Sequence, residues 1–382
     1  MKTLYDEITH PPRYPKLKKL IAPLVWVLIP CALLGIFCLC RGSRTLMNRF
    51  VNSFTHPVHR ILSRLCEVFT PYSAAEALWL LAILAALIFL VRTIWLLIRR
   101  PDRLLRLVRR VLALISALLF LYAGYTALWG VCYYADDFTD LSGITPRGAT
   151  VEELTTLTAS FASALNECAD AVPRDENGIF DVDLNELFSC TSGIYDGICA
   201  EFPFLTAEER TPKMLVSSRL MSILDFTGFF FPFTGEALLN VDSPECLIPA
   251  TILHELAHQR GIAEEDECNF VAILAGLRCD DPVYRYSSAL LGFIHLGNAL
   301  YSADPETYYA IRAALTDSVS ADLADNSAYW AQFDSPLDQA AVKVSNTVYE
   351  GFLQSYDQTD GLRTYGRCVD LLVAYYFDGY RP

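Results

Sequence analysis

The chain has 382 residues, of which 53% are hydrophobic, so general disorder is excluded. Its formal net charge of −14 is divided unevenly, because residues 1–134 carry 17 Lys and Arg against 5 Asp and Glu, whereas residues 135–382 carry 13 against 39. The acidic C-terminal part excludes nucleic acid as a partner, and twelve cysteines are too sparse for a disulfide-stapled scaffold.

Three long apolar segments near the N-terminus are each long enough to cross a bilayer. They occupy residues 20–40, 77–98 and 111–134, and roughly 20 helical residues span a hydrocarbon core of about 30 Å. The first follows a basic flank, but its apolar run is too long for a signal peptide and no A-x-A-like cleavage site follows it. The sequence therefore predicts a three-helix transmembrane region over residues 1–134, embedded in the lipid bilayer of the cell membrane.

The distribution of Lys and Arg predicts the orientation of these spans. If the N-terminus is inside, the N-terminal tail and loop 99–110 place eleven basic residues on the inner side, against five in loop 41–73 on the outer side. We therefore expect a cytoplasmic N-terminus and an extracytoplasmic segment 135–382. Apolar residues with helical spacing at 61–69 predict either a helix along the membrane surface or a cap on the bundle.

Residues 135–382 are numerous enough for one large domain. Helical apolar spacing occurs over residues 152–168 and 214–224 and over most of the chain beyond Pro282. The aromatic segment 228–235, bounded by glycines, is instead typical of a short strand or an extended edge. The predicted fold is therefore mainly α, with a mostly helical soluble domain that contains a short strand.

The segment His254-Glu-Leu-Ala-His258 carries the most specific chemical signal. Residues four apart on a helix face the same way, so His254 and His258 can bind one zinc ion together. Glu255 then lies beside the open coordination position, where it can act as general base on a zinc-activated water molecule. For a chain of this composition, the chance of this pattern arising at random is about half a per cent.

A zinc site of this kind needs a third protein ligand, and the acidic run 264–267 supplies candidates. Acidic residues also suit a helix N-terminus, which accounts for at least two of them. On a helical wheel, Glu265 shares its face with Asn269 and with small residues that let another helix approach. Glu265 is therefore the predicted third ligand, and Glu264 and Glu267 stay open as alternatives.

Glu265-x-x-x-Asn269 resembles the E-x-x-x-D signature of gluzincin metallopeptidases, with Asn in place of Asp and a shorter distance from His258 than those families have. In gluzincins the Glu is the third ligand. The chain also resembles a bacterial family of three-span membrane proteins classified as domain of unknown function 3810, through Pro232–Glu236, His254–Gly261 and Glu265–Phe270. The resemblance to gluzincins implies a zincin-like soluble domain, and neither resemblance names a substrate.

Together these features predict a membrane-anchored zinc metallopeptidase that hydrolyses peptide bonds outside the cytoplasm. The alternative is a zincin-like scaffold or sensor that binds metal without turnover. A peptide or protein is the expected substrate, and the sequence does not identify it.

Overall fold

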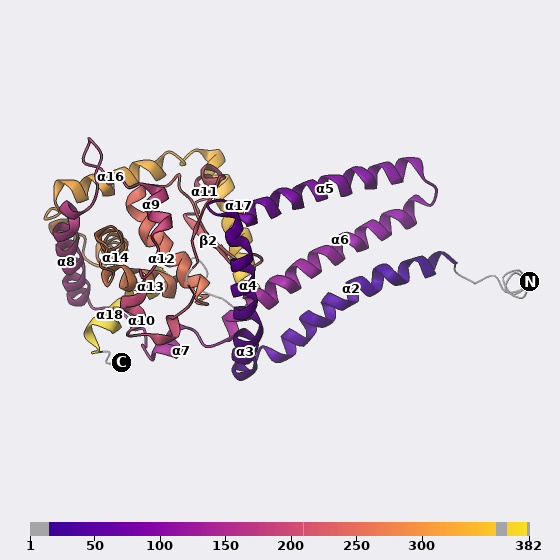
Figure 1. The fold of residues 1–382 in the computed structure, drawn as a ribbon, viewed down its shortest axis with the longest axis horizontal. Coiled ribbons are helices and arrows are strands. Elements are labelled where there is room, and N and C mark those ends of the chain that lie inside the picture. The colour runs from indigo at the N-terminus through magenta and orange to yellow at the C-terminus, as the bar shows by residue number, and fades with distance from the viewer. Residues whose placement is uncertain (1–14, 209, 357–364, 380–382) are drawn as a thin grey trace, which may run out of the picture.

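The computed structural model describes residues 15–208, 210–356 and 365–379. Lys2 and Arg13, two basic residues of the predicted cytoplasmic tail, lie outside the described residues. The structure is mainly helical, as predicted, and consists of three long helices that project from one side of a helical body (Figure 1).

The projecting helices are α2 (Pro15–Cys40), α5 (Ala74–Arg99) and α6 (Arg103–Tyr125). Each is long and apolar enough to cross a bilayer, which confirms three candidate spans and a multi-pass membrane protein. The third apolar segment ends at Gly130 rather than at Tyr134. The helix widens there into a π-helical turn and is followed by a 3-10 turn, Cys132–Tyr134.

Two short helices cross the base of the projecting helices, between them and the body (Figure 1). They are α3 (Arg44–Phe50) and α4 (His56–Cys66), joined by a π-helical turn. Thr55 donates a hydrogen bond to the carbonyl of Ala127 at the end of the third span (2.9 Å). This bond joins the loop to the end of the helix bundle, while Ile61, Leu65 and Val68 are exposed, so a helix along the membrane surface stays a prediction.

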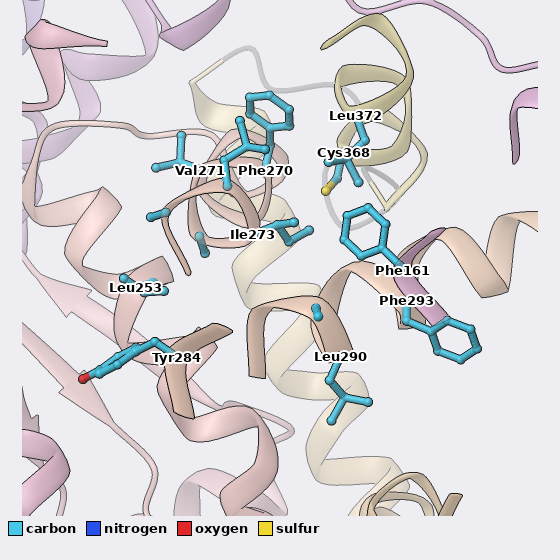
Figure 2. Packing of buried hydrophobic residues seen from close by; sticks show 14 of the residues in the cluster. Phe161, Leu253, Phe270, Val271, Ile273, Tyr284, Leu290, Phe293, Cys368 and Leu372 are labelled. Atoms are coloured by element: carbon cyan, nitrogen blue, oxygen red, sulfur yellow. The ribbon is translucent and has the colours of Figure 1, made fainter. Parts of the chain in front are cut away.

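The body contains twelve helices within the described residues, several of them short. In chain order they are α7 (Phe138–Ser142), α8 (Val151–Cys168), α9 (Leu184–Ser189), α10 (Asp196–Cys199), α11 (Ser218–Ile223), α12 (Ile248–Gln259), α13 (Glu265–Leu277), α14 (Pro282–Ala303), α15 (Pro305–Arg312), α16 (Asp317–Ala331), α17 (Pro336–Ser355) and α18 (Tyr365–Phe377). Figure 2 shows the core where α8, α12, α13, α14 and α18 meet. Leu253, Phe270 and Leu290 lie in this core and are fully buried. The core therefore holds α12 and α13, the two helices that carry the metal-ligating residue types, in fixed relative positions.

A small sheet lies beside α12, with strand order β1-β3-β2. Its strands are β1 (Lys213–Met214), β2 (Gly228–Phe231) and β3 (Glu236–Leu239). The predicted strand within 228–235 is confirmed as β2, which pairs antiparallel with β3. The helix predicted over 214–224 begins only at Ser218, because the preceding residues pair in parallel with the end of β3.

Glu236 connects this sheet to the second span. Its carboxylate accepts hydrogen bonds from the backbone N–H groups of Ala74 (3.0 Å) and Ala75 (2.9 Å), at the first turn of α5. The first N–H groups of a helix have no partner within the helix, and a negative charge suits that end. Glu236 is therefore a cap for the second span.

We expect Glu236→Ala to destabilise the protein, because it leaves two buried N–H groups without an acceptor. An unsatisfied buried donor costs about 1–3 kcal/mol. The thermal unfolding midpoint of the detergent-solubilised chain should fall relative to wild type and to Glu152→Ala, a control at an exposed position on α8. Equal midpoints for both variants would show that the cap contributes nothing.

Candidate metal centre

The local sequence explains why the two histidines share one helical face. Pro249 suits the first turn of α12, and Gly261, at φ +99°, ends the helical segment in a backbone conformation that other residues rarely adopt. His254 and His258 therefore lie one turn apart on an uninterrupted helix. Their ring centroids are 4.9 Å apart, with the ring planes nearly perpendicular.

Glu265, in the first turn of α13, faces both histidines. Its Oε2 lies 3.1 Å from Nε2 of His254 and 3.5 Å from Nε2 of His258. Burial opposes ionisation of this carboxyl group, but the adjacent imidazoles of His258 and His254 hold its pKa well below the usual value. The structure thus brings together the three residues that the sequence singled out, around one carboxylate oxygen.

The other ring nitrogens are occupied by hydrogen bonds. Nδ1 of His254 lies 2.9 Å from Oδ1 of Asn269, and Nδ1 of His258 lies 2.8 Å from the carbonyl oxygen of Ile262. Because both partners are acceptors, each Nδ1 donates a proton, and each Nε2 faces Glu265 and becomes available to a metal ion when the imidazole is neutral. This is the usual arrangement of metal-ligating histidines, whose orientation is fixed by such outer partners. Asn269 therefore supplies an acceptor at the position where gluzincins have Asp.

Cys268 is a possible ligand that the sequence reasoning missed. The ligand atoms of His254, His258 and Cys268 all lie within 4.8 Å of one another, so these three residues could hold a metal ion. The Cys268 sulfur lies 3.2 Å from Nδ1 of His258, on the opposite ring edge from Glu265. Its place three residues after Glu265, one helical turn along α13, is the sequence signal that points to it.

The two possible donor sets differ in the nitrogen that His258 would use. With Cys268, the ion would need Nδ1, which already bonds to Ile262. Burial also raises the pKa of the Cys268 thiol to about 12, which disfavours the thiolate that metals bind. With Glu265, the ion would use the Nε2 atoms of the two neutral imidazoles and an ionised carboxylate. The hydrogen bonding therefore favours Glu265 over Cys268.

The alternatives Glu264 and Glu267 do not face the histidines in the described structure. The Glu267 carboxylate accepts hydrogen bonds from the N–H groups of Phe138 (2.9 Å) and Thr139 (3.3 Å), and so holds the start of α7. Glu264 immediately precedes α13 and makes no side-chain capping bond there. No contact recorded among the described residues joins either carboxylate to His254 or His258.

Glu255 is buried beside the histidines, with 3% of its surface exposed. Its Oε2 has no hydrogen-bond partner among the described residues. Its Oε1 lies against Gly228, where an added Cβ would come within 2.7 Å. Burial raises the Glu255 pKa to about 7, against the lowering effect of His254 and His258. A buried carboxylate oxygen without a partner is costly unless a further group bonds to it, so this residue fits a site that takes up a metal ion and a reactant.

Three polar side chains in the first turns of α14 form hydrogen bonds elsewhere in the body. Tyr284 donates to the Leu187 carbonyl (3.4 Å), Tyr286 to Asp322, and Arg285 to the Cys279 carbonyl (2.8 Å). These bonds support packing roles for the segment 284–286.

Residues 50–373 match the family described as "Protein of unknown function (DUF3810)". This range begins in α3 and includes the two later spans, both metal-site helices and most of α18. Neither a curated protein nor a solved structure matches the chain.

Proposed function

The chain belongs to the DUF3810 family, whose function is unknown, and we propose from its candidate site that it is a membrane-anchored zinc metallopeptidase. His254, His258 and Glu265 are the proposed ligands, and Glu255 is the proposed general base. The observation that carries this proposal is the position of one Glu265 oxygen against both Nε2 atoms, beside the unpartnered Oε2 of Glu255.

Zinc is the metal that this donor set suits best. Two imidazoles and one carboxylate are typical of catalytic zinc sites, which keep a fourth position open for water or substrate. A structural zinc site would instead be closed by four protein ligands. The arrangement therefore favours catalysis over a purely structural metal.

When bound, zinc would supply a Lewis acid that acidifies a water molecule and polarises the substrate carbonyl. Glu255 would accept the proton of that water and deliver it to the leaving amine. Asn269 and the Ile262 carbonyl keep the two imidazoles in the required tautomer and orientation. Gly228 leaves room for the Glu255 carboxylate, because any side chain there would collide with it.

We also propose that the site faces away from the cytoplasm. The support is the concentration of arginines at the turn between α5 and α6, the end of the spans that lies far from the body (Figure 1). A reporter enzyme fused after residue 150 should be active only outside the cytoplasm. Activity restricted to the cytoplasm would reverse the orientation and leave the metal site unaffected.

The activity is tested with the full chain in detergent, loaded with zinc and incubated with a random peptide library. Mass spectrometry should detect new peptide ends, whose formation stops with 1,10-phenanthroline and resumes when zinc is restored. If the zinc-loaded protein cleaves nothing, the non-catalytic scaffold or sensor becomes the better hypothesis. Cleavage that persists after the metal is removed would exclude a metallopeptidase.

A further inference from the structure

We infer that the substrates are polypeptides tethered to the membrane, cleaved within a few residues of the lipid surface. This inference rests on the proposed function, to which it adds a substrate class. It follows from where the fold places the candidate metal centre relative to the three spans.

The His258 ring touches the end of the third span. The ring of Trp129 lies edge-to-face against it, with centroids 5.6 Å apart. The apolar part of this span begins at Val111, directly after Arg109 and Arg110. Roughly 20 helical residues cross the hydrocarbon core, so a span that starts at Val111 leaves the core near Gly130. Trp129 therefore lies at the membrane interface, where Trp is enriched, and His258 is in contact with it.

The packing around Trp129 also includes the loop between the two metal-site helices and parts of the spans. One buried apolar cluster joins segments from both parts of the molecule. It contains Met47 and Val51 at the base of the spans, and Trp129 and Cys132 at the end of the third span. It also contains Phe230 of β2 and Ala263, which lies two residues before Glu265. Phe37 and Cys40, at the end of α2, pack against the same cluster. Because this cluster is continuous, the site cannot be separated from the membrane by a flexible linker.

The turn between β2 and β3 extends toward the membrane and lies between the second and third spans. The Phe231 ring lies 6.1 Å from the ring of Trp79 in α5. On the other side, the Phe233 ring lies against Gly124 of α6, 3.3 Å from the position of an added Cβ. Trp79 is near the start of the second span and Gly124 is near the end of the third, so both lie close to the same membrane interface. The tip of the β2–β3 hairpin therefore lies at the level of the lipid headgroups or within the hydrocarbon core.

Strand β2 connects this tip to the catalytic carboxylate. Gly228, at one end, lies against Glu255, and Phe231, at the other end, lies against Trp79. Three residue steps of about 3.3 Å separate them, which is about 10 Å. β2 is the outer strand of the sheet in the described structure. A polypeptide extended along β2 thus has one end at Glu255 and the other at the bilayer, so a membrane tether needs only a few residues to reach the site.

The test uses the full chain in vesicles of phosphatidylcholine and phosphatidylglycerol at 3:1. A random decapeptide library is attached to a palmitoyl anchor through a Gly-Ser spacer of about 5 or about 30 residues, with root-mean-square lengths of about 12 Å and 30 Å. Local concentration at a site near the anchor falls as roughly the −3/2 power of spacer length. We therefore expect the short-spacer library to be cleaved about tenfold faster than the long-spacer library, and the soluble library more slowly still. The Glu255→Gln variant supplies the background.

Faster cleavage of the long-spacer library would place the site too far from the lipid and overturn the inference, as would equal rates for the tethered and soluble libraries. In both cases the proposed peptidase activity would stand. If no library is cleaved by the zinc-loaded protein, the proposed function itself fails, and the substrate class fails with it.

Discussion

Glu255→Gln is expected to keep its zinc and its fold while losing on the order of 10²–10⁴ in hydrolytic rate. Glutamine has nearly the same shape as glutamate but cannot accept the proton of the attacking water. Glu255 itself is not a proposed ligand, since both Nε2 atoms face Glu265 instead. The variant also removes the charge of a buried carboxylate whose Oε2 lacks a partner, so it should not destabilise the protein.

The measurement compares zinc content, thermal unfolding midpoint and cleavage of the peptide library between wild type and Glu255→Gln. Glu245→Gln is a matched control, because Glu245 is a half-buried carboxylate just before the same helix and accepts a hydrogen bond from the N–H of Val182 (2.8 Å). The control should cleave as wild type does. Unchanged cleavage by zinc-loaded Glu255→Gln would show that another group takes the proton.

The second large effect concerns the metal itself. His254→Ala combined with His258→Ala should remove zinc binding, because both candidate donor sets use these two residues. Glu265→Ala should lower zinc affinity strongly, since it deletes the carboxylate that faces both Nε2 atoms. Cys268→Ser should keep most of the affinity, because its sulfur lies on the Nδ1 side of His258. Asn269→Ala should lower affinity by about 10- to 100-fold, as loss of an outer partner usually does.

Zinc content by mass spectrometry and affinity by competition with a chelator distinguish these variants. Wild-type zinc content in the double histidine variant would refute the metal site altogether. If Cys268→Ser loses zinc and Glu265→Ala keeps it, the sulfur is the third ligand, and Glu265 is then only a charge partner of the histidines.

The sequence alone was sufficient to predict the features that depend only on residues close together in the chain. The three spans follow from the length of each apolar run, because crossing a bilayer needs a minimum number of helical residues. The shared direction of His254 and His258 follows from the helical repeat, and the place of Glu265 and Asn269 on one face follows from the same repeat. Each of these features involves residues within a few turns of one another, so the tertiary contacts do not alter them.

Tertiary structure decided what depends on distant segments. The carbonyl of Ile262 reaches His258 only because the chain turns sharply at Gly261, and this bond is what sets Cys268 and Glu265 on opposite ring edges. The short strand β1 forms by pairing with β3, which overrode the local helical pattern. Glu236 caps a helix that begins about 160 residues earlier in the chain. The contact of Trp129 with His258 likewise joins a membrane span to a motif far along the sequence. No periodicity encodes such contacts, because they arise only when packing of the whole core brings the segments together.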